Sequence, residues 1–167
     1  NIGMGREALS ANTSGAGNVA LGYESLKANT SANFNTGVGN STLRANTTGS
    51  LNTAVGSAAM MSNTTGVQNT GLGYDALKDN TEGGYNTGLG SNALANNTTG
   101  SSNTAVGVGS SNTSTTGSNN TALGYYSLLL TTTGSNHTAL GFEALRNNTT
   151  ADSNTAIGFR ALKENTT

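Results

Sequence analysis

Few side chains in this 167-residue chain have the types and spacing that catalysis or metal binding requires. His137 is the only histidine and there is no cysteine, so a zinc ion would find no sufficient set of ligands. Gly-x-Gly pairs such as Gly71–Gly73 lack the third glycine, long helix and following acid of a dinucleotide site. Serine, histidine and aspartate nowhere form a recognisable triad. We therefore expect no enzyme activity, no metal and no cofactor.

Charged residues do recur at a fixed spacing, with an acid followed three positions later by a base. The pairs are Glu24 with Lys27, Asp75 with Lys78, and Glu143 with Arg146. Such residues are neighbours on a helical surface, and the residues between them are small and then large and apolar. This pattern predicts a single helical or 3₁₀ turn with its charges outward. A strand there would instead put Glu143 and Leu145 on one face.

These pairs belong to a repeat of seventeen residues that runs through the chain without insertion or deletion. A fixed period of this length predicts a solenoid with one coil per repeat, so we treat 1–167 as a single domain. Repeats begin at residues 1, 18, 35, 52, 69, 86, 103, 120, 137 and 154, and the last is incomplete. The fifth position is always glycine: Gly5, Gly22, Gly39, Gly56, Gly73, Gly90, Gly107, Gly124, Gly141 and Gly158. The thirteenth is always threonine: Thr13, Thr30, Thr47, Thr64, Thr81, Thr98, Thr115, Thr132, Thr149 and Thr166.

Each part of the repeat predicts a local structure. Asn-Thr-Ala-Val at its start predicts a short strand, which the glycine ends at a corner of the coil. Asn-Thr-Thr-Gly near its end predicts either a second short strand or an Asx turn, with asparagine and threonine ladders along the stack. The fold class is therefore all-β, a parallel β-solenoid with short helical or 3₁₀ turns.

Two columns of large apolar residues are expected to form the core. They are the fourth position (Val55, Leu72, Leu89, Leu123, Leu140) and the ninth (Leu77, Leu94, Leu128, Leu145). The repeat at 103–119 carries Ser111 at its ninth position, and we expect it to be the weakest coil. Hydrophobic residues make up only 33% of the chain, so the core is thin, and sharing it between chains would stabilise it. We expect a homotrimer with coils in register.

The asparagines that precede threonine create eight glycosylation sequons. They are Asn12, Asn29, Asn46, Asn63, Asn97, Asn112, Asn148 and Asn165. The alternative is that these residues serve turn and ladder bonding. Aromatic residues at the sixth position pack between coils or chains, or stack on sugars: Tyr23, Tyr74, Tyr125, Phe142 and Phe159. His137 replaces the first-position asparagine and is expected to be a tolerated member of that ladder.

The strand motif resembles a known element. Asn-Thr-Ala-Val-Gly at 52–56 and Asn-Thr-Ala-Ile-Gly at 154–158 are similar to the S-V-A-I-G element in the heads of YadA-like trimeric autotransporter adhesins. The longer form, N-T-A-x-G-x-x-A-L-x-x-N-T-T-G, resembles shaft repeats of tail-fibre-domain proteins of phages, viruses and some bacteria. This resemblance implies a trimeric β-solenoid shaft. The seventeen-residue period is longer than that of the adhesin heads, and no stalk, anchor or chaperone domain is recognisable.

Two function classes follow from the sequence. The first is a structural fibre, the shaft of an extracellular adhesin, a surface filament or a phage or virion tail fibre, acting by multivalent attachment and mechanical extension. The second is an ice- or glycan-binding solenoid that uses its regular Thr and Asn rows. We expect an extracellular, cell-surface or virion location, with self-association, surface glycans as partners and continuation beyond both ends. The net charge of −1 favours neither nucleic acid nor membrane as a partner.

Overall fold

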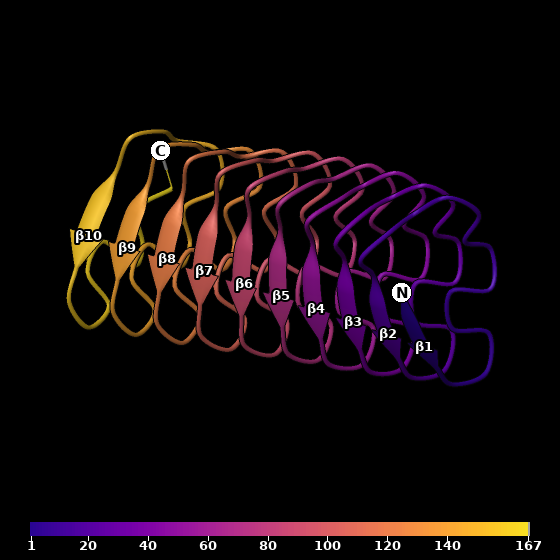
Figure 1. The fold of residues 1–167 in the computed structure, drawn as a ribbon. Helices are drawn as coiled ribbons and strands as arrows, with labels where there is room; N and C mark the ends of the chain where they lie inside the picture. Colours follow the sequence, from indigo (N-terminus) through magenta and orange to yellow (C-terminus); the bar gives the residue numbers. More distant parts are fainter. Residues whose placement is uncertain (167) are drawn as a thin grey trace.

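The computed structural model describes residues 1–166 and shows one elongated stack of coils, with a three-residue strand in each coil (Figure 1). The strands form a single parallel sheet in chain order. They are β1 (Ile2–Met4), β2 (Val19–Leu21), β3 (Thr36–Val38), β4 (Thr53–Val55), β5 (Thr70–Leu72), β6 (Thr87–Leu89), β7 (Thr104–Val106), β8 (Thr121–Leu123), β9 (Thr138–Leu140) and β10 (Thr155–Ile157). The predicted parallel β-solenoid is confirmed. Thr167, the last residue of the predicted domain, lies outside the described residues.

The register between coils equals the sequence repeat. Thr53 pairs with Thr70, and Val55 pairs with Leu72, so each residue stands beside its counterpart seventeen residues on. Backbone bonds also join the coils away from the sheet. The amide of Thr47, for example, donates to the carbonyl of Thr64 at 3.0 Å. Because the same contact recurs from coil to coil, each sequence column becomes a row along the stack.

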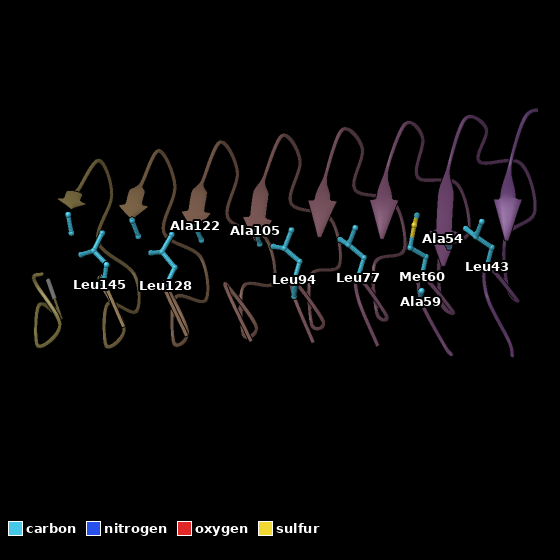
Figure 2. Packing of buried hydrophobic residues seen from close by; sticks show 14 of the residues in the cluster. Leu43, Ala54, Ala59, Met60, Leu77, Leu94, Ala105, Ala122, Leu128 and Leu145 are labelled. Atoms are coloured by element: carbon cyan, nitrogen blue, oxygen red, sulfur yellow. The ribbon is translucent and has the colours of Figure 1, made fainter. Parts of the chain in front are cut away.

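The interior is built from the third, eighth and ninth positions of the repeat, with eighth-position alanines such as Ala59 and Ala93 fully buried. Alanines at the third position, such as Ala54 and Ala105, and leucines at the ninth, such as Leu77 and Leu94, are fully buried. Figure 2 shows the leucine row beneath the strands, with no leucine between Leu94 and Leu128. The predicted burial of the ninth-position leucines is confirmed.

The predicted burial of the fourth position is wrong. Val55, Leu72, Leu123 and Leu140 are between 37% and 43% exposed, and Leu89 is half-buried. Successive strand residues point to opposite faces, so the inward third position forces the second and fourth outward. Small residues at the third position leave room inside the coil for the opposing leucine.

The predicted helical turn is also wrong, because residues 1–166 contain no helix. Between the fifth and twelfth positions the chain makes successive turns. In the first coil the backbone N–H groups of Ala8, Ser10 and Asn12 donate hydrogen bonds to the carbonyls three residues earlier, those of Gly5, Glu7 and Leu9. The seventh and ninth residues have positive φ in every coil, for example 54° at Asp75 (seventh) and 52° at Leu77 (ninth). The left-handed conformation costs leucine roughly 1–2 kcal/mol, which burial of its side chain offsets.

Glycine at the fifth position is required for two reasons. Its φ is 135° at Gly39, a conformation that other residues rarely adopt. A Cβ at Gly39 would also lie 2.7 Å from the carbonyl oxygen of Gly56 in the next coil. This explains why the column admits no other residue.

The segment from the twelfth to the fifteenth position is a bend that closes the coil, so the predicted second strand is wrong. Its asparagine bonds through the side-chain amide rather than through the side-chain oxygen of an Asx turn. The Asn46 side-chain amide donates to the carbonyl of Gly49 at 2.9 Å, and the Asn63 amide donates to Oδ1 of Asn46 at 2.7 Å. A second ladder follows the first position, where the backbone N–H of Asn52 donates to Oδ1 of Asn35 at 2.9 Å. Both predicted asparagine rows are therefore buried, hydrogen-bonded ladders.

Candidate binding surfaces

The outer face of the sheet presents two parallel rows. The second position supplies a row of threonines from Thr36 to Thr155, and the fourth supplies valine, leucine and isoleucine from Val38 to Ile157. An apolar row of this length on the surface of a small chain is typical of a contact face.

The two threonine rows differ in what their hydroxyl groups do. At the thirteenth position each hydroxyl donates to the carbonyl of the next coil's threonine, as Thr64 does to Thr81 at 3.0 Å. Second-position hydroxyls such as those of Thr53 and Thr87 have no hydrogen-bond partner within residues 1–166. The thirteenth-position hydroxyls therefore hydrogen-bond successive coils to one another, whereas the second-position hydroxyls remain available to bind an external surface.

The sixth-position aromatic residues form a stack at the C-terminal end. Tyr125 and Phe142 have ring centroids 5.4 Å apart with planes 9° apart, and Phe142 and Phe159 follow at 5.3 Å and 13°. Stacked rings cover one another's faces, so for these three the packing interpretation holds better than sugar stacking. Tyr74 stands between two serines of its column and is largely exposed, and there sugar stacking stays a prediction.

Ion pairs concentrate near the two ends of the stack. The predicted pairs form at 2.9 Å for Glu24 with Lys27, 3.9 Å for Asp75 with Lys78, and 3.6 Å for Glu143 with Arg146. Turns rather than a helix bring them together. Hydrogen bonding from Lys27 lowers the pKa of the Glu24 carboxyl, against the opposing effect of desolvation.

At the C-terminal end one carboxylate is shared by several cations. Glu143 meets Arg160 and Lys163 at 2.9 Å each, as well as the more distant Arg146. The hydrogen bond from Lys163 lowers the pKa of the Glu143 carboxyl, while desolvation acts in the other direction. The cluster therefore carries an excess of positive charge.

Two hollows lie on the turn side of the stack. One, of about 370 Å³, is lined by Ser10, Ala11, Lys27, Ala28, Arg44 and Ala45. The other, of about 390 Å³, is lined by Asn92, Val108, Gly109, Asn112, Tyr126, Leu129 and Arg146. We call the second the central hollow. It lies across the 103–119 coil, where the repeat departs furthest from its pattern.

The predicted glycosylation sites are mostly enclosed. Asn29, Asn46, Asn63, Asn97 and Asn148 are fully buried in the twelfth-position row, so the folded coils do not present these amides. Their ladder and turn bonds support the alternative role. Asn12, Asn112 and Asn165 are half-buried, and glycosylation stays a prediction there.

His137 takes over the bonding of the asparagine it replaces. The imidazole Nδ1 accepts the backbone N–H of Asn154 at 3.2 Å, and the backbone N–H of His137 donates to Oδ1 of Asn120 at 2.9 Å. Burial lowers the pKa of the imidazole from its ordinary value of about 6.5. The ring is a ladder member, and within residues 1–166 no group of three His, Cys, Asp or Glu residues is placed to hold a metal ion.

Among the described residues there is no helix long and apolar enough to span a membrane. Comparison with known proteins finds no matching family model, no related protein and no similar solved structure. The outer surfaces of the stack are therefore the features of the chain that bear on its function.

Proposed function

We propose that this chain is a segment of a structural fibre, the shaft of an extracellular adhesin, a surface filament, or a phage or virion tail fibre. It works by mechanical extension and by presenting repeated weak contacts to a surface. The observation that carries this proposal is the unbroken register of ten strands in chain order. A stack with one coil per repeat extends by adding coils and needs no change in any existing contact.

The internal bonding suits a rod that must resist extension. Two asparagine rows and one threonine row connect successive coils inside or beside the thin core. Such ladders align identical side chains at every step, as in other stacked β assemblies. They fit a protein that must hold its shape outside the cell.

The outer apolar row supports lateral self-association. Exposed Leu72, Leu123 and Leu140 would leave water if copies of the chain packed through their sheets. We propose a homotrimer with coils in register, since a second or third copy presents the same spacing along its own row. Repetition of weak outward contacts along such a rod then supplies avidity toward a glycan-coated surface.

Light scattering after size exclusion tests self-association of the full chain. We expect a trimer, and we expect Leu72→Lys with Leu123→Lys to give a folded monomer, because both changes lie on the outer face. Lys78→Glu, on the turn side, is the matched control and should stay trimeric. A wild-type chain that remains monomeric at high concentration would overturn lateral association.

One observation favours a second function. The second-position threonines, whose hydroxyls have no partner among the described residues, alternate with valine and leucine on the outer face of one parallel sheet, at a repeat of about 4.7–4.8 Å along the stack. A face of this kind suits an ordered surface such as ice. Thermal hysteresis in the wild type that disappears in Thr87→Tyr would support ice binding, and no hysteresis at any concentration would remove it.

A further inference from the structure

We propose that the central hollow is a binding site for an acidic sugar, with Arg146 pairing with its carboxylate. This inference rests on the proposed attachment function and gives it a specific ligand-binding site. The threonine and apolar rows of the sheet face repeat from coil to coil, whereas the central hollow occurs where the repeat departs furthest from its pattern.

The hollow exists because the 103–119 coil lacks side chains that other coils carry. Its seventh position is Gly109, where other coils have residues such as Glu24 or Asp75. The ring of Tyr126 from the next coil lies over that glycine, with its Cδ1 2.5 Å from where a Cβ of residue 109 would stand. The walls are thus set by seventh- and tenth-position residues of four successive coils, together with Val108 from the sixth position.

Arg146 is the one cation among the residues that line the hollow, and its guanidinium is only partly satisfied: Nη1 donates to Oδ1 of Asn147 at 3.4 Å, and Nε is left over. Its Nε lies 3.6 Å from Oε1 of Glu143 and has no hydrogen-bond partner within residues 1–166 although it is buried. The Glu143 carboxylate binds Arg160 and Lys163 more closely. An unpaired buried donor on a guanidinium favours an added anion.

No carboxylate on the N-terminal side of the hollow competes for Arg146. Residues 83–142 contain no Asp, Glu, Lys or Arg, so the surrounding coils are electrically neutral. A ligand carboxylate would therefore meet one positive charge and no repulsion from that side.

The other hollow provides the contrast. Its cations are neutralised by carboxylates of the chain, since Lys27 lies 2.9 Å from Glu24 and Arg44 lies 2.6 Å from Glu24. Its remaining lining is alanine and one serine. It offers neither free charge nor hydrogen-bonding amides, and the central hollow offers both.

The rest of the lining fits a sugar ring better than a simple anion. Asn112 donates to the carbonyl of Asn92 at 3.0 Å through Nδ2, and its Oδ1 has no partner among the described residues. Val108, Leu129 and the Tyr126 ring supply apolar surface. A few polar groups within an apolar lining are typical of small-molecule sites, and here amide, apolar and cationic groups match the hydroxyls, ring carbons and carboxylate of a uronic acid.

Titration of the full ¹⁵N-labelled chain with methyl β-D-glucuronide tests the site by amide chemical shifts. We expect saturable shifts confined to the lining of the central hollow, and binding of methyl β-D-glucoside, which lacks only the carboxylate, weaker by about tenfold or more. Equal binding of the two glycosides, no saturable shifts, or acetate reproducing the full shifts would overturn the proposal.

Variants separate the site from the fold. Arg146→Gln should weaken glucuronide binding by about tenfold or more, whereas Arg44→Gln, at the same repeat position in the other hollow, should leave it unchanged. Gly109→Ala keeps Arg146 but fills the hollow and displaces Tyr126, so it too should weaken binding. Unchanged binding in both Arg146→Gln and Gly109→Ala would refute the site. Light scattering of the same samples reports self-association separately, so failure of this site and failure of the fibre proposal are distinguishable.

Discussion

The coils at 86–102 and 103–119 are adjacent and equally paired in the sheet, yet their interiors differ. β6 and β7 pair along three residues, and so do β7 and β8. Inside, the first coil has Leu94 and Asn97 where the second has Ser111 and Ser114. The polar atoms left buried without a partner include Oγ of both serines and Oδ1 of Asn97.

This contrast separates what aligns the coils from what stabilises them. Strand pairing continues unchanged across the coil that has lost its leucine and its ladder amide, so the sheet does not depend on the residues inside. Each buried polar atom without a partner costs about 1–3 kcal/mol, and the missing leucine removes apolar burial. The interior columns therefore decide local stability, whereas the central hollow on the outside of the same coil comes from Gly109 at its seventh position.

The largest effect is expected when the stronger coil is made to resemble the weaker one. Leu94→Ala should lower the free energy of unfolding by roughly 2–5 kcal/mol, because it leaves a cavity in a fully buried row. Urea denaturation followed by circular dichroism measures this. A loss no larger than that of Leu89→Ala, on the outer face, would contradict the assignment of the two sides.

The reverse change should repair the weak coil. Ser111→Leu should stabilise the chain by about 1–3 kcal/mol, because it buries a leucine and removes an unpartnered hydroxyl. Residue 111 has φ of 49°, close to that of the leucines in the other coils. Thermal unfolding measures the change in stability. Destabilisation would contradict the prediction, because it would show that the interior of this coil has no room for a leucine side chain.

Restoring the ladder should have a smaller effect. Ser114→Asn gives Asn97 Oδ1 a donor and adds a donor to the Gly117 carbonyl, which should stabilise by about 0.5–1.5 kcal/mol. Ser118→Asn, on the half-exposed part of the same coil, is the control and should change little. Equal effects of the two would mean that ladder continuity does not matter.

His137 shows the opposite case, a ladder substitution that keeps its bonds. Because burial lowers the pKa of the folded-state imidazole below about 6.5, with Asp152 opposing, the unfolded chain binds more protons. Stability is then complete above about pH 6.5 and falls as the pH drops below it. His137→Asn should remove that part of the pH dependence, measured by urea denaturation from neutral to acidic pH. An unchanged profile would contradict burial of a neutral ring.

The smallest effect is expected on the turn side. Lys78 lies 3.9 Å from Asp75 and is half-buried, and exposed pairs of this kind contribute little. Lys78→Ala should change the free energy of unfolding by under about 0.5 kcal/mol. If Lys78→Ala lowered the free energy of unfolding as much as Leu94→Ala does, the turn side would stabilise the coil as much as the buried leucine row, which would contradict this prediction.

The period, the strand, the ladders and the inward leucines could all be predicted, because each depends on a repeated residue type. The orientation of Val55 and its column could not be predicted from hydrophobicity alone, since two apolar columns competed for a thin interior. The alanine and glycine of the third position were the informative signal. A strand position that carries only alanine or glycine indicates the side of the strand that faces the interior of a narrow coil.

Other features had weaker signals in the sequence. Positive φ at Leu77 and its counterparts has none, because leucine disfavours that conformation and the column contains no glycine or asparagine. The central hollow could have been found by aligning the repeats, where Gly109 stands alone in its column. Its charge could not, because the sharing of Glu143 by three cations depends on distances between coils.

Hydrogen exchange resolved coil by coil tests most directly whether the interior, rather than the sheet, sets local stability. The amides of β6 and β7 have equivalent bonds, so a sheet-controlled stack would protect them equally. We expect faster exchange throughout 103–119 than in 86–102 and 120–136, and equal rates after Ser111→Leu with Ser114→Asn. Exchange in 103–119 as slow as in both flanking coils of the wild type would contradict the account.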